Sequence, residues 1–331
     1  MKSPFEQNII AMVWDCDKTL ISSYMQDPLF KHFNVDGGKF WQEVNALKAY
    51  YGKQGISVNA DTSYLNHILT YVKAGLFKGL NNALLREFGR ELKFYPGLPQ
   101  FFGEVKNLIN NDEKYKAFDI RLEHYVVSPG FAETIRGSAI APFVDGIYGC
   151  EFIESPAQPG FLGEGGVSGD VPSADAVPAA STSASEISQI ASALDNTSKT
   201  RYLFEINKGS NKYPETIDVN SSIARESRRV PFENMVYIAD GPSDVPAFSI
   251  LNYNGGSTFA VYPKGDVKAF RQVDALRRDN RVQMFGEADY ETASQSWLWL
   301  TEKVRAIADK IVERKQAAIR NSAGAPPTHL N

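Results

Sequence analysis

Two carboxylates stand one residue apart at the end of an apolar run near the start of the chain. Asp15 and Asp17 directly follow the apolar residues 11–14. Residues i and i+2 of an extended segment face the same side, and two carboxylates that share a site repel each other unless a cation or a shared proton intervenes. Hard oxygen ligands of this kind suit Mg²⁺. The spacing alone is also compatible with a turn in which Asp17 or Thr19 caps a helix.

Other polar side chains follow apolar runs later in the chain. Ser128 comes directly after residues 122–127, and Asp240 comes directly after residues 235–239, with Asp244 four positions further on. Ligands of open parallel sheets bind at the carboxyl ends of the strands. If these runs are strands of one sheet, their polar residues gather at the same edge as the two acids of the first run. Asp-Gly-Pro is also common in plain turns, which leaves that alternative open for the last two acids.

The elements that must position these residues alternate along the chain. Short runs rich in Val, Ile and Tyr predict buried strands at 8–14, 122–127, 235–239 and 258–262. Apolar residues at helix spacing predict a helix over 99–110 and an amphipathic helix over 297–311, both packed on the core. Strands that alternate with helices favour an α/β fold with a parallel sheet.

The composition divides the chain into a discontinuous core and two insertions. Residues 23–94 contain helical patterns punctuated by glycines and no strong strand signal, which predicts a smaller helical domain inserted into a core of residues 1–22 and 95–321. Residues 155–200 are rich in Pro, Gly, Ser and Ala, which predicts a flexible or low-complexity insertion. Within it, residues 185–194 could form a short helix.

Bulk composition excludes several classes of protein. The 331 residues are 43% hydrophobic, which is enough for a sizeable core and about two domains. A formal net charge of −4 gives no nucleic-acid footprint, and two cysteines, Cys16 and Cys150, make neither a disulfide framework nor a zinc site. No apolar run is long enough to span a membrane and no targeting signal is evident. We therefore expect a cytoplasmic protein with no nucleic-acid or membrane partner, ending in a polar tail at 322–331; the sequence does not indicate its oligomeric state.

Four motifs in chain order resemble those of the haloacid dehalogenase-like (HAD) superfamily. "DCDKTL" resembles the first motif, Asp-x-Asp-x-Thr after an apolar strand, and "HYVVSPGF" resembles the second, with Ser128 at a strand end. "FEINKGS" can supply the third motif, with Lys208, and "MVYIADGPSDVPAF" resembles the fourth, with Asp240 and Asp244.

This resemblance covers residues 8–21 and 96–270 and implies a Rossmann-like core. The helical insertion at 23–94 is similar in position to the cap domain of the phosphoserine-phosphatase-like branch of the superfamily.

The resemblance also implies roles for the acids. Asp15 would be the nucleophile that forms an aspartyl-phosphate, and Asp17 would be the general acid and base. Mg²⁺ would be held by Asp15, the backbone carbonyl of Asp17, and Asp240, with Asp244 beside or behind it.

Three further residues would bind the phosphate. The resemblance assigns this role to the backbone N–H of Cys16, the hydroxyl of Ser128 and the ammonium of Lys208. The anionic neighbourhood of Cys16 disfavours a thiolate, so we do not expect it to be a nucleophile. Lys212 or Lys199 could hold the lysine role instead of Lys208.

The chain departs from the superfamily pattern at two places. Pro129 follows Ser128 and has no N–H to offer the phosphate, so that donor is absent or comes from Gly130. Phosphoserine phosphatases also carry a Glu after the first motif that holds the substrate amine, and no equivalent Glu is present. Phosphoserine is therefore not predicted as the substrate.

Substrate specificity is expected to come from the start of the insertion. Candidate contacts are Tyr24, Gln26 and His32, which closely follow the first motif. Phe30 is as well explained by packing within the helical domain, and His32 could be an ordinary surface histidine.

These observations predict a Mg²⁺-dependent phosphatase that acts on a small phosphorylated metabolite. Phosphotransferase or mutase chemistry on the same fold, and a non-catalytic module that binds a phosphorylated ligand, are the alternatives. A dehalogenase would use the first Asp without the acid and base, so the presence of Asp17 argues against that activity.

Overall fold

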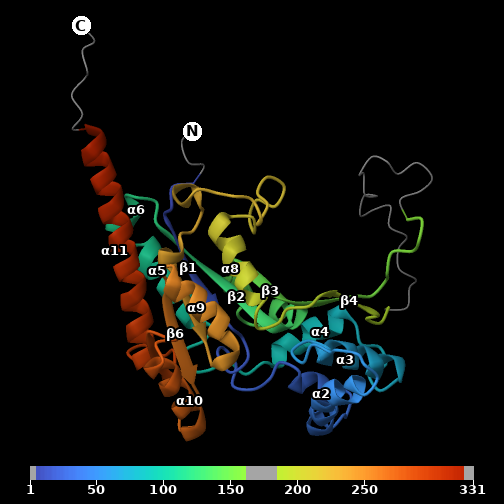
Figure 1. Cartoon of the computed structure of the whole chain (residues 1–331). Coiled ribbons are helices and arrows are strands. Elements are labelled where there is room, and N and C mark those ends of the chain that lie inside the picture. The colour runs from blue at the N-terminus through green and yellow to red at the C-terminus, as the bar shows by residue number, and fades with distance from the viewer. Residues whose placement is uncertain (1–4, 162–184, 324–331) are drawn as a thin grey trace.

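The computed structural model describes residues 5–161 and 185–323, which are built on a seven-stranded sheet (Figure 1). The strand order is β4-β3-β2-β1-β5-β6-β7, and every neighbouring pair is parallel except β3 and β4. This sheet and its flanking helices confirm the predicted α/β fold. The strands are β1 (Ile9–Trp14), β2 (Arg121–Phe131), β3 (Gly146–Ile153), β4 (Gln189–Ser192), β5 (Met235–Ala239), β6 (Ser257–Tyr262) and β7 (Met284–Glu287).

The central strand β1 is apolar throughout, and all of its residues are buried. Its last residue, Trp14, pairs with Val126 of β2 on one side and with Ile238 of β5 on the other. The carboxyl ends of these three strands therefore meet at one edge of the sheet. The same register places Asp15 and Asp240 directly after adjacent strands, as the sequence predicted.

Helices cover both faces of the sheet. They are α5 (Gln100–Asn110), α6 (Glu113–Lys116), α7 (Ala132–Arg136), α8 (Lys199–Lys208), α9 (Val245–Tyr253), α10 (Val267–Arg278) and α11 (Gln295–Ala323). Helices α5 and α11 pack together on one face, and α8 and α9 pack together on the other (Figure 1). Phe101, Phe102, Val105 and Ile109 of α5 are buried as their spacing predicted, and Leu108 is partly buried. Within the described part of the chain, no helix is long and apolar enough to cross a membrane.

The chain between β1 and α5 forms a helical segment of its own, which we call the helical segment (residues 27–91). It contains α1 (Asp27–His32), α2 (Gly37–Gly52), α3 (Ser63–Lys73), α4 (Asn82–Phe88) and the 3₁₀ helix η1 (Gly89–Glu91). The side chain of Asp36 caps the N-terminus of α2, and that of Asn81 caps the N-terminus of α4. Phe40 and Phe77 are buried in a small aromatic core with Phe30.

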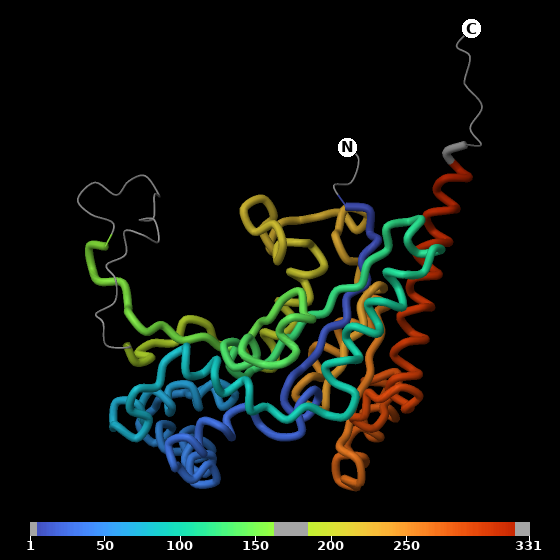
Figure 2. The backbone as a smooth tube through the Cα atoms, turned by 180° about the vertical axis from the view of Figure 1, so that it is seen from behind, coloured from blue at the N-terminus to red at the C-terminus, as the bar shows by residue number. Residues whose placement is uncertain are grey.

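The helical segment lies against α7 and the β3–β4 pair (Figures 1 and 2). The fit at α7 is close enough to require glycine on both sides: a Cβ at Gly89 would lie 2.1 Å from the carbonyl oxygen of Thr134, and a Cβ at Gly137 would lie 1.7 Å from that of Arg86. At the sheet, the backbone N–H of Ile187 donates to the carbonyl of Leu80. The segment is therefore attached to the sheet well away from its two chain connections.

The structure corrects one expectation about residues 155–200. Residues 185–194 do not form a helix, because β4 pairs there with the edge strand β3. Ile187 and Leu194, at either end of this strand, are buried in the core. Helix α8 then begins at Lys199. Residues 162–184 and most of the predicted tail lie outside the described residues.

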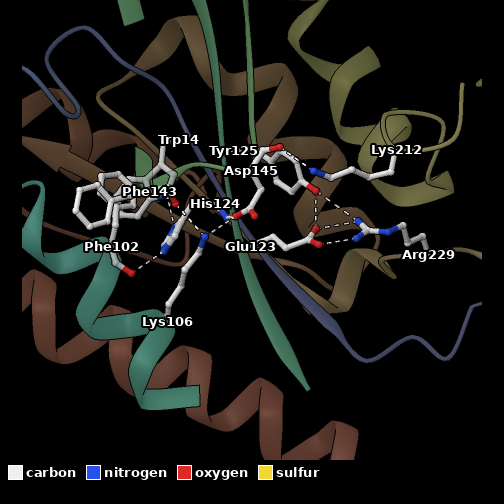
Figure 3. A network of polar contacts seen from close by, with 10 residues as sticks. All are labelled: Trp14, Phe102, Lys106, Glu123, His124, Tyr125, Phe143, Asp145, Lys212 and Arg229. Atoms are coloured by element: carbon white, nitrogen blue, oxygen red, sulfur yellow. Dashed lines mark hydrogen bonds and ion pairs between the residues drawn. The ribbon is translucent and has the colours of Figure 1, made fainter. Parts of the chain in front are cut away.

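A buried polar network holds the first half of β2 against its neighbours (Figure 3). The indole N–H of Trp14 donates to Nδ1 of His124 at 3.2 Å, and Nε2 of the same imidazole lies 3.2 Å from the carbonyl oxygen of Phe102 on α5. The backbone N–H of His124 donates to Asp145, which also pairs with Lys106 at 2.8 Å. Burial, and to a smaller extent the charge of Lys106, lowers the pKa of His124 to about 3, so the imidazole is neutral.

On the other side of β2, Arg229 pairs with Glu123, whose carboxylate also accepts a hydrogen bond from Tyr125 (Figure 3). The two networks attach β2 both to α5 and to the loop before β5. They fix the strand that delivers Ser128 to the carboxyl edge.

Candidate active site

A buried lysine joins two of the predicted acids at the carboxyl edge of the sheet. Nζ of Lys199 lies 2.9 Å from Oδ1 of Asp15 and 2.6 Å from Oδ1 of Asp244. All three side chains are almost fully buried. An ammonium between two carboxylates compensates part of the cost of burying them. Asp15 and Asp244 thus belong to one cluster although they follow different strands.

The second pair of acids comes from the turn after β5. Asp240 directly follows this strand, and Asp244 ends the 3₁₀ helix η6 (Pro242–Asp244) and precedes α9. The Tyr237 hydroxyl donates to Oδ1 of Asp244 at 2.6 Å, and the Ser243 hydroxyl donates to Oδ2 at 2.9 Å. Carboxylate oxygens of Asp15, Asp240 and Asp244 all lie within 4.8 Å of one another. This is a set of hard oxygen donors close enough to share one cation.

The protonation of the cluster follows from its burial. Burial raises the pKa of Asp15 to about 6; the attraction of Lys199 opposes this rise, and the charge of Asp244 adds to it. Burial, reinforced by the charges of Asp15 and Asp244, raises the pKa of Asp240 to about 7. Burial alone would lower the pKa of Lys199, but the two carboxylates raise it above its ordinary value, so the ammonium stays charged. The cluster therefore contains one positively charged lysine and three acidic side chains.

Asp17 lies two positions after Asp15, in the turn that follows β1. Its Oδ1 accepts a hydrogen bond from the backbone N–H of Met25 at 3.1 Å, and its pKa is raised well above the ordinary value by burial and then by the charge of Asp15. The turn that carries it is closed by the Cys16 carbonyl, which accepts hydrogen bonds from the backbone N–H groups of Thr19 and Leu20. No helix begins here, since α1 starts only at Asp27. The alternative in which Asp17 or Thr19 caps a helix is therefore wrong.

Cys16, between the two acids, is a buried thiol. Burial and the charges of Asp17 and Asp15 raise its pKa well above the ordinary value. A thiol in this state is not a nucleophile at neutral pH.

The predicted serine lies near the end of β2 in the neighbouring strand. Because Val126 pairs with Trp14, Ser128 lies close to the level of Asp15. Ser128 is fully buried, and its hydroxyl oxygen accepts a hydrogen bond from the backbone N–H of Gly130 at 3.1 Å. The N–H that could replace the one missing at Pro129 is thus already directed to the serine hydroxyl.

The structure corrects the choice of lysine. Nζ of Lys208 donates to the backbone carbonyls of Val219 and Ser221, at the far end of α8 from Asp15. Nζ of Lys212 donates to the carbonyl of Asp145. Neither lysine is paired with an acid of the cluster.

A sequence signal could have identified Lys199. It shares one face of α8 with the buried residues Leu203 and Ile206, at the i, i+4 and i+7 spacing of a core-facing stripe. A lysine on such a stripe needs an acidic partner in the core. Lys208 lies off this face.

The three candidate specificity residues have different surroundings. The ring of Tyr24 is partly exposed, lies 4.5 Å from Nζ of Lys18, and is close to Trp41 of α2. Gln26 is buried, and its Oε1 has no hydrogen-bond partner among the described residues. His32 is exposed, and its ring packs on Phe33 and Phe88. His32 is thus part of the surface of the helical segment.

Residues that the sequence analysis missed cover the site. The side chain of Met25 packs against Gly130, where a Cβ would lie 2.2 Å from the methionine sulfur. Tyr64 of α3 donates its hydroxyl to the carbonyl of Pro129 at 2.5 Å. Together they close the end of β2 from the side of the helical segment. Neither residue forms part of a motif, so only the tertiary structure reveals them.

Fold and site together define an α/β protein with a buried lysine–carboxylate centre at the carboxyl edge of its sheet. The chain belongs to the same family as a protein from Borreliella burgdorferi that is described only as uncharacterized. The two are 36% identical over 302 residues, which is 90% of this chain and 97% of that protein. No family model matches the chain.

Solved structures with a similar fold include a HAD family hydrolase from Salmonella enterica serovar Typhi, at 13% identity and a TM-score of 0.47 over 85% of this chain and 68% of that one. They also include a phosphoserine phosphatase in the form of a phospho-aspartyl intermediate analogue, at 13% identity and a TM-score of 0.45 over 84% of this chain and 93% of that one.

Proposed function

We propose that this protein is a HAD-like phosphatase that hydrolyses a small phosphorylated metabolite through an aspartyl-phosphate on Asp15. The observation that carries the proposal is the cluster at one edge of the sheet, in which Asp15, Lys199 and Asp244 are buried and Asp240 is partly buried beside them. The ordered motifs around Asp15, Ser128 and Asp240 support it independently.

Asp15 acts as the nucleophile. At neutral pH a carboxyl group with a pKa of about 6 is mostly ionised, and Lys199 orients one of its oxygens at 2.9 Å. An oxygen of Asp15 attacks the phosphorus, and the bond from phosphorus to the leaving oxygen breaks. Lys199 and the Ser128 hydroxyl are available to stabilise the negative charge of the transferred group.

Asp17 acts as the acid and then the base. Burial raises its pKa well above the ordinary value and so favours the protonated carboxyl, which gives its proton to the leaving oxygen. The resulting carboxylate then takes a proton from the water that attacks the phosphorus of the aspartyl-phosphate. The acyl oxygen–phosphorus bond breaks, and Asp15 is regenerated. The backbone N–H of Met25 holds Asp17 in place during both steps.

The donor set fits Mg²⁺. Three carboxylates share a buried site with one lysine, which leaves negative charge that a divalent cation would compensate. Asp15, Asp240 and Asp244 would hold the ion, together with the backbone carbonyl of Asp17 that the superfamily resemblance implies. When bound, the ion reduces the repulsion between the anionic nucleophile and the anionic substrate.

The helical segment acts as the cap that excludes water from the site. Met25 and Tyr64 already cover the end of β2 from the side of the helical segment. Gln26 is the strongest specificity candidate, because its buried Oε1 lacks a partner that a donor group of a substrate could supply.

An aryl phosphate assay on the full-length protein tests this proposal. We expect hydrolysis that requires Mg²⁺ and that is abolished by Asp15→Asn, with Asp279→Asn, an exposed site on another element, as the control. Activity that persists in the Asp15→Asn variant would contradict the nucleophile. Stabilisation by Mg²⁺ and phosphate with no turnover across a broad panel of phosphoesters would instead favour a non-catalytic binding module. Transfer of phosphate to a sugar acceptor would favour a phosphotransferase or mutase.

A further inference from the structure

A cavity of about 540 Å³ lies at the opposite end of the parallel strands from Asp15. Phe232 and Gly255 line it, and they closely precede β5 and β6. The cavity is therefore at the amino ends of β5 and β6, and the carboxyl end of β5 leads to Asp240. Its volume is within the range of about 300–1,000 Å³ that is typical of small-molecule pockets.

Positive charge dominates the wall of this cavity. Arg225 and Arg228 both line it, with Glu233 as the acid among them. Glu233 is already shared between Arg225, at 3.2 Å, and Arg314, at 3.6 Å. Among the described residues, the guanidinium of Arg228 makes one hydrogen bond, from Nε to the carbonyl of Ile223. Guanidinium groups arranged in this way favour an anion such as a phosphate.

A buried polar atom also lies at the cavity. Asn207 lines it and is fully buried, and its Nδ2 donates to the carbonyl of Val230 at 2.7 Å. Its Oδ1 has no hydrogen-bond partner among the described residues. A buried acceptor without a partner is costly. A ligand with an N–H or O–H donor could remove that cost.

The cavity also has an aromatic wall. Tyr253, the last residue of α9, lines it and is 90% exposed. An exposed aromatic ring beside two arginines provides a stacking surface for a planar ring next to a phosphate site.

We propose that this cavity is a binding site for a nucleoside phosphate, which we call the nucleotide pocket (Asn207, Arg225, Arg228, Phe232 and Tyr253). The phosphate would pair with Arg225 and Arg228, the base would stack on Tyr253, and a donor group of the ligand would reach Asn207. A ligand with only one of these chemical groups would leave part of the pocket unused.

The nucleotide pocket is connected to the catalytic cluster by two helices. Helix α8 begins with Lys199 and carries Asn207 near its other end; helix α9 follows Asp244 and ends with Tyr253. At 1.5 Å per residue, the ten residues of α8 span about 15 Å and the nine residues of α9 about 13.5 Å. A ligand in the pocket would thus contact both helices that hold the cluster. Its binding does not rest on the proposed function.

Calorimetric titration of the full-length protein with AMP in EDTA tests binding without turnover. We expect Arg225→Gln and Arg228→Gln each to weaken AMP binding at least tenfold, and Tyr253→Ala to weaken it by about 5- to 100-fold, the range for loss of base stacking. Tyr253→Phe should bind AMP as the unaltered protein does. Arg90→Gln, an exposed arginine in the helical segment, is the matched control and should have no effect.

Ribose 5-phosphate and inorganic phosphate identify which part of the ligand is recognised. Both should bind at least tenfold more weakly than AMP and should not respond to Tyr253→Ala. Equal binding of all three probes would overturn the assignment of a nucleoside phosphate. The proposal is likewise overturned if AMP gives no binding at about 5 mM, or if AMP binds the arginine variants and Tyr253→Ala undiminished, as it would at the catalytic cluster.

Discussion

The ammonium of Lys199 lies 2.9 Å from a carboxylate oxygen of Asp15, although 184 positions separate the two residues in the chain. The contact forms because Lys199 is the first residue of α8 and lies on the buried face of that helix. From there its side chain reaches the carboxylate that directly follows β1. The same ammonium also reaches Asp244. A single helix start therefore connects the predicted nucleophile to the turn after β5.

Replacing this lysine should separate its role from that of the lysine at the other end of the same helix. We expect Lys199→Met to reduce aryl phosphate hydrolysis by about 100-fold or more, because it removes the charge that orients Asp15 and stabilises the transferred group. Lys208→Met is the matched control and should keep near-normal activity, because its ammonium donates to backbone carbonyls away from the cluster. Equal losses in both variants would contradict the assignment of Lys199.

The role of Asp17 can be tested through the leaving group. We expect Asp17→Asn to slow hydrolysis of an alkyl phosphate about 100-fold or more, because an alkoxide needs a proton as it leaves. An aryl phosphate with an acidic phenol should be much less affected in the first step, so a burst of phenol followed by slow turnover is expected. Stopped-flow measurement of the first, leaving-group step with both substrates checks this; an equal loss in the rate of that step for the two leaving groups would count against the general acid.

Metal binding should appear as a change in stability that depends on the acids of the cluster. A ligand that binds only the folded state at about 100 times its dissociation constant stabilises the protein by about 2.7 kcal/mol. We expect Mg²⁺ to raise the melting temperature of the unaltered protein and to lose most of this effect in Asp240→Asn. Asp279→Asn, an exposed acid at the end of α10, is the control. A full Mg²⁺ shift in Asp240→Asn would exclude Asp240 as a ligand.

The buried imidazole of His124 should contribute a pH dependence to stability. Its pKa is about 3 in the folded protein, against an ordinary value of 6.5 for an exposed histidine, so between these values the unfolded chain binds a proton that the folded chain does not. This contribution is therefore fully present above pH 6.5 and falls as the pH drops toward 3, by at most about 1.4 kcal/mol per pH unit.

Urea unfolding in EDTA between about pH 4 and about pH 7.5 checks this prediction. The variant His124→Asn should show a less steep loss of stability toward low pH than the unaltered protein. The comparison of slopes is needed because Asp15 and Asp240, whose pKa values are raised on folding, contribute in the opposite direction. Identical slopes in the two proteins would contradict a neutral His124 in the folded state.

The close fit between the helical segment and α7 should depend on its glycines. We expect Gly89→Ala to destabilise the protein by about 1–3 kcal/mol, because the new methyl group would collide with the backbone of Thr134. Gly52→Ala is the matched control: it has open space around it at the end of α2, so it should be neutral or slightly stabilising. Chemical denaturation measures the free energy of unfolding of both variants. Equal values would contradict the prediction, because they would show that the contact between Gly89 and Thr134 can adjust to a methyl group without loss of stability.

The sequence predicted the elements with strong local signals and missed those defined by their partners. The apolar runs at 8–14 and 235–239 are β1 and β5, and the residues after them lie at the predicted edge. β4 was missed because its few paired residues have little apolar content and depend on the edge of β3. The short segment around Lys208 led to the choice of that lysine, with Lys199 left as an alternative; the buried face of α8 is the stronger signal, and it selects Lys199. Met25 and Tyr64 carry no local signal at all, because their position depends on how the helical segment lies on the sheet.

The attachment of the helical segment to β4 and α7 limits how a substrate can enter. A whole-body swing about the two chain connections would have to break the Leu80–Ile187 hydrogen bond and separate the glycine contacts at Gly89 and Gly137. Residues 22–26 carry Met25, and its displacement alone would uncover Asp17 and Gly130. In the proposed phosphatase, displacement of residues 22–26 would therefore be enough to admit a substrate, and the rest of the helical segment would stay in place.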